Sequence, residues 1–260
     1  MIDVLFTQLL RSAVFLALPA ALLTACAGPP QSSGAKPDYR ALLDAPDRSE
    51  ADRTQDKKRN APEFLSFIGP RPGMKVLDFG AGRGYSTELL ARSVAPNGVV
   101  YAQNSPKLLE AIPAIKERFD ERLKSPAMKN VVPVVREFDD PIPPEAKNLD
   151  LVTSFFIYHD TVHLGVDRAK MNKAIFNALK PGGVYIVADH SAKPGAGATL
   201  TKTLHRIEDS IVRKEVEAAG FQLVDEGKFL HNPNDPREES VFKTAIPNDE
   251  FVLKFVKPQG

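Results

Sequence analysis

One short segment limits the possible folds more than any other part of the chain. An apolar run at residues 74–79 is followed by the loop Gly80-Ala81-Gly82-Arg83-Gly84 and then by a helical pattern over residues 85–94. Three glycines at alternate positions allow the backbone to turn sharply and to approach a ligand closely, and the first N–H groups of the helix face that ligand. We therefore expect a strand–loop–helix unit with a binding site at the loop.

The rest of the chain alternates short apolar runs with longer helical patterns. Further strands are expected at residues 99–103, 131–136, 149–157, 184–188, 221–224 and 251–256, with helices at 107–124, 162–179 and 200–220. The continuous apolar run at 149–157 is typical of a strand buried on both faces, and Pro133 favours an edge position for its strand. This order predicts an α/β fold with a mostly parallel sheet wound on both faces.

The details of the glycine loop separate several kinds of ligand site. A phosphate-binding loop would end in Gly-Lys-Ser/Thr, which is missing here, and a dinucleotide fingerprint spaces its last glycine further along. Asp78 instead stands two residues before the first glycine. A second distinctive stretch, Leu179-Lys180-Pro181-Gly182-Gly183, precedes the fifth expected strand.

In these two motifs the chain resembles class I S-adenosylmethionine (SAM) dependent methyltransferases, from about Arg48 to the C-terminus. It is more similar still to a group of predicted, exported bacterial methyltransferases. The features shared with that group are the Arg53/Asp56/Arg59 segment, Tyr158-His159-Asp160, Asp189-His190-Ser191 and Leu204-His205-Arg206. The resemblance implies a Rossmann-like, doubly wound, seven-stranded sheet with an antiparallel last strand, SAM as cofactor, and methyl transfer as the activity.

The resemblance also implies a cofactor site. The glycine loop would pass under the methionine part of SAM, Asp78 would hold its ammonium group, and Asp139 or Asp140 would lie near the adenine. The family usually has an acidic residue for the ribose where this chain has Asn104, and an amide offers one acceptor oxygen and no charge. We expect the change from an acidic residue to Asn104 to weaken the binding of SAM by on the order of 1 kcal/mol, which is roughly tenfold in affinity. The expected cofactor residues are Asp78, Gly80, Ala81, Gly82, Gly84, Asn104, Asp139 and Asp140.

Polar side chains end two neighbouring strands of the expected sheet. His159 and Asp160 close the fourth strand, and Asp189 and His190 close the fifth. Because parallel strands end at one edge, we expect these groups at one mouth, together with His205 from the following helix. An imidazole there can deprotonate a hydroxyl or amine acceptor while a carboxylate fixes its tautomer. The candidate catalytic residues are His159, Asp160, Asp189, His190 and His205.

Two other interpretations of these residues stay open. Each histidine alone can equally be a polar residue that caps a strand or a helix. As a set, His159, Asp160, His163, His190 and His205 can also be metal ligands, because His159 and His163 have one-turn spacing. We expect no metal, because the stretch changes from strand to helix between them. The single cysteine, Cys26, excludes a zinc site made of several thiolates.

Charge and composition bear on the partners. The chain has 34 Lys and Arg against 33 Asp and Glu. This balance argues against a large basic surface for nucleic acid. Phe155, Phe156 and Tyr158 can form a wall for an apolar acceptor, although alternate residues of a strand must point into the core. The expected acceptor is a small molecule. The alternative is a non-catalytic SAM-binding or ligand-binding protein with the same fold, which Asn104 and export from the cytoplasm would favour.

The N-terminus has the layout of a secretory signal. Arg11 precedes an uncharged apolar run at residues 12–25, which is too short for a lasting membrane helix. Leu23-Thr24-Ala25-Cys26 resembles a bacterial lipobox, in which Cys26 is lipidated. We therefore expect an exported, periplasmic lipoprotein that contacts the membrane only through its lipid anchor. The expected parts are a signal peptide (1–25), a tether (26–38), a helical extension (39–72) and the methyltransferase domain (73–260).

Overall fold

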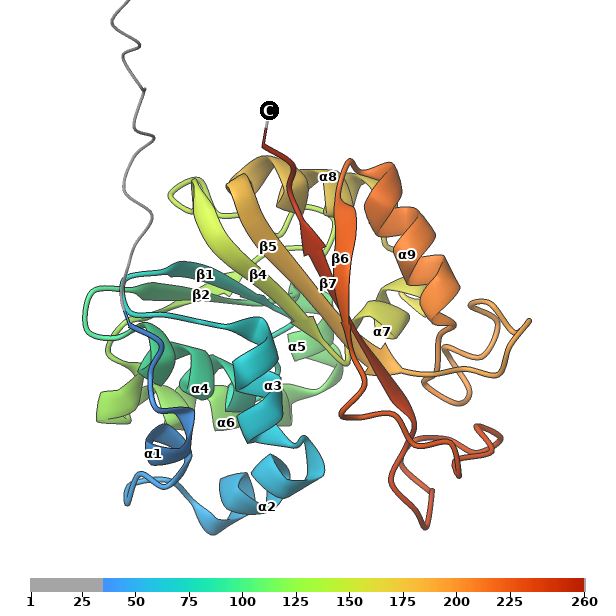
Figure 1. The fold of residues 1–260 in the computed structure, drawn as a ribbon, viewed down its shortest axis with the longest axis horizontal. Helices are drawn as coiled ribbons and strands as arrows, with labels where there is room; N and C mark the ends of the chain where they lie inside the picture. Colours follow the sequence, from blue (N-terminus) through green and yellow to red (C-terminus); the bar gives the residue numbers. More distant parts are fainter. Residues whose placement is uncertain (1–34, 260) are drawn as a thin grey trace, which may run out of the picture. The chain divides into compact units, whose positions relative to one another are not determined.

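The structure is a computed structural model that describes residues 35–259 (Figure 1). The expected signal peptide, Cys26 and most of the expected tether lie outside the described residues. Among the helices that the structure does describe, none combines the length and apolar character needed to cross a membrane.

A seven-stranded sheet forms the centre of the described chain, as the sequence predicts. Its strands are β1 (Lys75–Phe79), β2 (Val99–Asn104), β3 (Val131–Val135), β4 (Leu149–Phe155), β5 (Leu179–His190), β6 (Gln222–Gly227) and β7 (Glu250–Val256). They lie in the order β3-β2-β1-β4-β5-β7-β6, and only β7 runs antiparallel to its neighbours. The edge position predicted for the strand with Pro133 is confirmed. The chain order reverses between β1 and β4, where ligands of such sheets bind.

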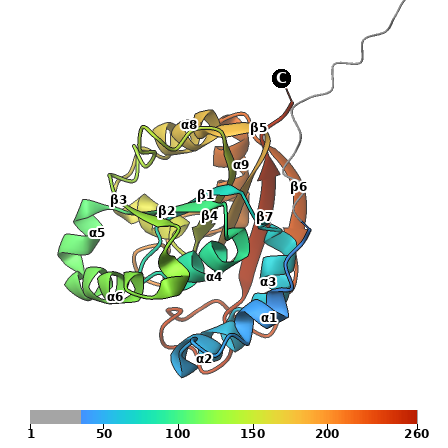
Figure 2. The same cartoon turned by 90° about the vertical axis from the view of Figure 1, so that its left-hand side faces the viewer.

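Helices cover both faces of the sheet (Figure 2). The described helices are α1 (Tyr39–Leu43), α2 (Glu50–Lys58), α3 (Ala61–Ile68), α4 (Tyr85–Val94), α5 (Pro106–Ala111), α6 (Pro113–Leu123), η1 (Pro126–Met128), α7 (Tyr158–His163), α8 (Arg168–Ala178) and α9 (Asp209–Ala218). Alternate residues of β1 enter different cores, since side chains of a strand point to opposite faces. Leu77 joins the core that includes residues of α8 and α9, and Val76 joins the core that includes residues of α3 and α4.

Three of the predicted helices differ in the structure. The helix expected at 162–179 is interrupted, because α7 ends at His163 and α8 begins only at Arg168. The helix expected at 107–124 is divided at Ile112, because Pro113 has no N–H to continue a helix and begins α6 instead. The prediction of a helix at 200–220 is wrong for its first half. Residues 199–204 form turns, and α9 begins only at Asp209. His205 therefore lies on a loop rather than on a helix.

The N-terminal extension is fastened to the sheet domain by ion pairs. Arg122 of α6 binds Asp52 of α2, with 2.8 Å between Nη2 and Oδ1, and also pairs with Glu88 of α4. The side chain of Arg48 is fully buried, pairs with Asp56 inside the extension, and has its Nε 3.7 Å from Glu88 Oε1 in the sheet domain. These contacts place α2 and α3 beside the glycine loop.

Candidate functional site

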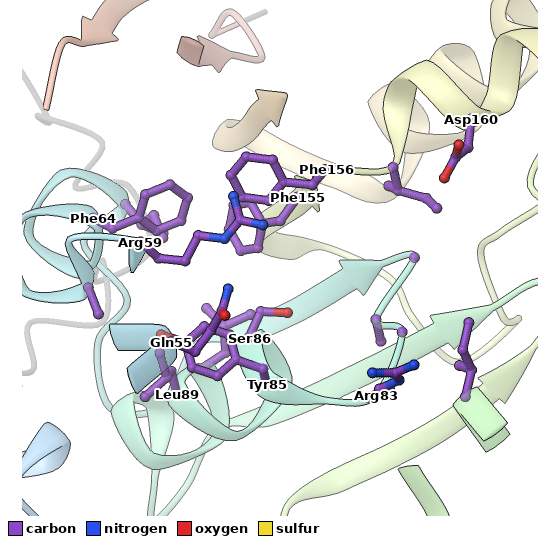
Figure 3. A pocket seen from close by; sticks show the side chains of 18 of the residues that line it. Gln55, Arg59, Phe64, Arg83, Tyr85, Ser86, Leu89, Phe155, Phe156 and Asp160 are labelled. Atoms are coloured by element: carbon purple, nitrogen blue, oxygen red, sulfur yellow. The ribbon is translucent and has the colours of Figure 1, made fainter. Parts of the chain in front are cut away.

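A cavity of about 340 Å³ opens at the carboxyl ends of β1 and β4. Its walls come from the glycine loop, the N-terminal extension, α5 with the start of α6, and the end of β4 (Figure 3). Of the predicted site residues, it is lined by Gly80, Ala81, Gly82 and Asp160. The cavity thus lies at the edge of the sheet where the sequence predicts a binding site.

The three glycines of the loop serve different purposes, although all have positive φ. A Cβ on Gly80 would lie 2.7 Å from Ile157, and a Cβ on Gly84 would lie 3.0 Å from Phe119. Close packing within the protein therefore requires these two glycines. A Cβ on Gly82 would enter free space, with its nearest neighbour, the Gly80 carbonyl oxygen, 3.9 Å away. Gly82 keeps bare backbone beside the cavity, which fits the close approach of a cofactor such as SAM.

Side chains of β2 hold the glycine loop in place. Gln103 Oε1 accepts a hydrogen bond from Gly80 N at 3.1 Å, and Asn104 Oδ1 accepts one from Gly82 N at 2.9 Å. Asn104 Nδ2 donates in turn to the Gly82 carbonyl at 3.2 Å. Asn104 is buried and does not line the cavity. Its expected contact with the ribose stays a prediction, while the structure uses both ends of its amide within the protein.

Asp78 is completely buried behind the loop. Its carboxylate accepts hydrogen bonds from Ser86 Oγ at 2.9 Å, Thr87 Oγ1 at 2.7 Å and Thr153 Oγ1 at 2.9 Å. Burial raises the pKa of Asp78, and the three hydroxyl donors oppose that shift. Asp78 thus ties β1 to α4 and β4. The structure places Ser86, rather than Asp78, on the wall of the cavity.

The two acidic residues expected near the adenine lie apart from this cavity. Asp139 Oδ2 is 3.2 Å from Lys170 Nζ, and Asp140 pairs with Arg136. Neither lines the cavity. The structure therefore does not bring them together with the glycine loop.

The polar groups expected at the ends of the fourth and fifth strands do meet. His159 and Asp160, predicted to close the fourth strand, lie instead in the first turn of α7, because β4 ends at Phe155. Asp189 lies at the end of β5, as predicted. His159 Nδ1 is 2.7 Å from Asp189 Oδ1, and the backbone N–H of His159 donates to Oδ2 at 2.8 Å. His159 Nε2 lies 3.0 Å from Asp160 Oδ1 and 3.2 Å from His205 Nδ1. We call His159, Asp160, Asp189 and His205 the histidine–aspartate cluster.

His159 is not the neutral imidazole that a general base would have to be. Burial by itself would lower the pKa of His159, but the carboxylates of Asp189 and Asp160 outweigh burial and raise it to about 10. Burial would raise the pKa of Asp189, but the charge of His159 prevails and lowers it. In the ion-free protein His159 is therefore an imidazolium at neutral pH. Asp160 alone of the cluster lines the cavity.

His190 belongs to a different group of side chains, which the sequence did not reveal as a unit. Its ring lies 4.9 Å from the ring of Phe156, and its Nδ1 is 3.0 Å from Glu250 Oε1 without hydrogen-bond geometry. Arg59 Nη1 donates to the same Glu250 oxygen at 2.8 Å. The Arg59 guanidinium carbon lies 3.3 Å from the centre of the Phe156 ring.

Phe156 has a strained backbone at this point. Its φ is +59°, a left-handed conformation that a bulky side chain rarely adopts. Such residues persist where their surroundings hold them, and they gather at functional sites. The Arg59/Asp56/Arg53 segment was the available sequence signal for this contact, but only the structure shows what Arg59 binds.

Comparison with known proteins agrees with this architecture. A family model described as "Methyltransferase domain" matches residues 70–220. The protein-L-isoaspartate O-methyltransferase of Ignicoccus hospitalis is 29% identical over 171 residues, which cover 64% of this chain and 72% of the relative. That of Aeropyrum pernix is 36% identical over 116 residues, which cover 44% of this chain and 42% of the relative.

Solved structures share the fold. A SAM dependent methyltransferase from Aquifex aeolicus superposes with a TM-score of 0.57 at 17% identity, covering 85% of this chain and all of the other. A putative sarcosine dimethylglycine methyltransferase from Galdieria sulphuraria has a TM-score of 0.57 at 16% identity, covering 81% of this chain and 91% of the other.

Proposed function

Since this chain belongs to the methyltransferase domain family and is a SAM-dependent methyltransferase, we propose that its acceptor is a small molecule bound at the aromatic end of the cavity. The supporting observation is that the N-terminal extension closes this end. Gln55, Arg59 and Phe64 of the extension line the cavity together with Phe155 and Phe156 (Figure 3). Because the extension and the end of β4 both contribute walls, the cavity suits a small ligand that it can enclose almost completely.

The residues of the chain have two roles in the proposed methyl transfer: some position the cofactor and the acceptor, and one accepts a proton. SAM, when bound, supplies the methyl group from its sulfonium. This transfer would be an in-line displacement, for which the residues of the chain have to align the acceptor with the cofactor. Gly82 gives the cofactor close access, and the rings of Phe155 and Phe156 orient the acceptor, because alignment supplies much of the acceleration in such a displacement.

Asp160 is the proposed proton-handling group. Its carboxylate faces the cavity and also lies 3.0 Å from His159 Nε2. A hydroxyl or amine acceptor can donate its proton to that carboxylate as the methyl bond forms. Asp189, His159 and His205 lie behind Asp160 and position it. His190, which the sequence placed among the catalytic candidates, is proposed to support the acceptor wall through Phe156.

The named relatives favour a second candidate acceptor. They are called protein-L-isoaspartate O-methyltransferases, so a carboxylate on an altered aspartyl residue is a specific alternative to a small molecule. Two arginines, Arg59 and Arg83, line this cavity; Arg59 is the one that stacks on the aromatic wall, and it is already paired with Glu250. A free cationic partner for such a carboxylate is therefore not provided by Arg59.

A radiolabelled methyl transfer assay separates these acceptors. The full chain is incubated with SAM labelled on its methyl group and offered either an isoaspartyl peptide or a panel of small alcohols, amines and carboxylates. Label on members of the small-molecule panel, lost in Phe156→Ala, supports the proposal. Label on the isoaspartyl peptide alone would replace it with the second candidate.

We also propose that the protein is exported and anchored by a lipid on Cys26, which the sequence pattern alone supports. The test is metabolic labelling with a radioactive fatty acid in cells that express the full chain. Label in the natural sequence and not in Cys26→Ser supports the anchor. Equal label in both, or none in either, would remove it.

A further inference from the structure

Three ligand atoms of different residues meet at one point of the histidine–aspartate cluster. His159 Nε2, Asp160 Oδ1 and His205 Nδ1 all lie within 4.8 Å of one another. We propose that these three residues form a site for a divalent transition-metal ion. This site is a further property of the protein, and its binding test does not depend on the identity of the acceptor.

The distances match those between ligands of one ion. They are 3.0 Å from His159 Nε2 to Asp160 Oδ1, 3.2 Å from His159 Nε2 to His205 Nδ1, and 3.3 Å from His205 Nδ1 to Asp160 Oδ1. Zinc binds histidine nitrogen at about 2.0–2.1 Å and carboxylate oxygen at about 2.0–2.2 Å, so neighbouring ligand atoms of a tetrahedral site are about 3.3–3.5 Å apart. One ion can therefore reach all three atoms with only small movements.

The chemistry of the donors narrows the choice of metal. Two imidazoles and one carboxylate suit zinc, and with open positions they suit iron(II). Calcium and magnesium prefer sites made of oxygen atoms. His163 Nε2 lies further out, 3.7 Å from Asp160 Oδ1, and is not counted among the three ligands.

Asp189 orients the imidazole of His159 so that Nε2 faces the proposed metal site. Since an ionised carboxylate can only accept hydrogen bonds, its contact with His159 Nδ1 requires the proton on that nitrogen. Nε2, which faces Asp160 and His205, is then the atom that binds a metal, in exchange for the proton that it carries in the ion-free protein. A carboxylate that orients a histidine in this way is the usual partner of a metal-binding imidazole.

The loop that carries His205 is built at considerable conformational cost. His205 has a φ of +55°, which is uncommon for a residue with a side chain. The next residue, Arg206, is completely buried and donates to Glu239 O at 3.0 Å, Ser191 O at 3.1 Å and Asn248 Oδ1 at 3.1 Å. These contacts hold the strained residue so that its ring meets His159. Strain that is fixed in this way accompanies functional sites.

The charge of the cluster also favours a cation. Among the residues that the structure describes, Asp160 and Asp189 form ion pairs with histidines only, and neither has a lysine or arginine partner. A divalent ion at His159 Nε2 would take the place of the proton that this atom carries in the ion-free protein, and the two carboxylates would then balance the charge of the ion. Because Asp160 also lines the cavity, the ion would lie at the cavity wall.

Metal titration of the full chain tests the site. The protein is stripped with a chelator and titrated with zinc chloride in a calorimeter, and the metal content of the untreated protein is measured by mass spectrometry. One ion per chain is expected. His205→Ala and Asp160→Asn should each weaken binding by at least tenfold, and Asp189→Asn should weaken it about 10–100-fold through loss of the orienting contact.

The control is His231→Ala, which removes an exposed histidine paired with Asp249. Zinc affinity should be unchanged in this variant, and circular dichroism should show that all variants are folded. Cobalt substitution then distinguishes a four-coordinate site, with strong visible absorption, from a six-coordinate site with weak absorption. Absence of saturable zinc binding, or equal affinity in the natural chain and His205→Ala, would overturn the proposal whether or not methyl transfer is observed.

Discussion

The side-chain amide of Asn104 forms two hydrogen bonds with the backbone of Gly82. Its Oδ1 accepts from Gly82 N at 2.9 Å, and its Nδ2 donates to the Gly82 carbonyl at 3.2 Å. An aspartate at this position could make only the first of these contacts, because both of its oxygens are acceptors. Asn104, which the sequence suggests as a weakened contact to the ribose, is therefore better suited than aspartate to hydrogen-bond the glycine loop.

This relationship predicts the effect of Asn104→Asp. The second carboxylate oxygen would face the Gly82 carbonyl oxygen, and the lost hydrogen bond is worth about 1 kcal/mol. We expect affinity for SAM, measured by calorimetry, to fall by roughly tenfold. The control is Asn177→Asp at an exposed position of α8, where no change is expected. An increase in affinity would instead show that this position acts on the ribose.

Gly82→Ala tests whether the bare backbone receives the cofactor. The new Cβ would enter free space in the protein alone, so SAM affinity should fall more than tenfold while the fold survives. The substitution also has a conformational cost of about 1–2 kcal/mol at this positive φ. Gly73→Ala is the matched control, because Gly73 also has positive φ with nothing near its Cβ. Equal loss of SAM binding in both variants would contradict a specific role for Gly82.

Arg59→Ala should destabilise the aromatic wall. The substitution removes the stacking on Phe156 and the hydrogen bond to Glu250, and a cation–aromatic contact contributes about 0.5–2 kcal/mol. For a chain of this size we expect Tm to fall by about 2–4 °C per kcal/mol. Arg59→Lys keeps the charge without the planar group and should recover only part of the loss. Complete recovery with lysine would mean that the Glu250 ion pair alone is important.

The ion pair between Arg122 and Asp52 predicts a dependence of stability on pH. Burial would raise the pKa of Asp52, but hydrogen bonds from Arg122 and Ser49 prevail and lower it. A carboxylate whose pKa is lower in the folded state stabilises the fold above its unfolded pKa of about 3.9, and this contribution is lost as the pH falls through the folded pKa. Denaturant unfolding should show Arg122→Gln less stable than the natural chain at pH 7. The difference should shrink below about pH 4, and a difference that is constant with pH would exclude this pair as its source.

Much of the fold was predictable because it depends on local patterns. The seven strands follow from apolar runs, and the helix at residues 85–94 has the same bounds in the structure. Pro133 indicated the edge strand because proline cannot donate to a neighbour on that side. The meeting of His159 and Asp189 was also predictable, since adjacent parallel strands end at the same edge.

The loop at His205 was not predictable from these patterns. Leu200, Leu204, Ile207 and Ile211 have helical spacing, but Arg206 is buried among partners that are 15 to 42 residues away in the chain. Those contacts are absent from any local window. They override the helical preference and direct His205 toward His159.

The sequence by itself determined the order of strands and helices, the glycine turn and the edge of the sheet where ligands bind. These depend on the spacing of apolar residues and on backbone freedom, which are local properties. Only the tertiary structure decided the partners of Asn104, Asp78, Arg59 and His205. A buried polar group takes the hydrogen-bond partner that the folded chain brings within about 3 Å, and that partner can come from anywhere in the sequence.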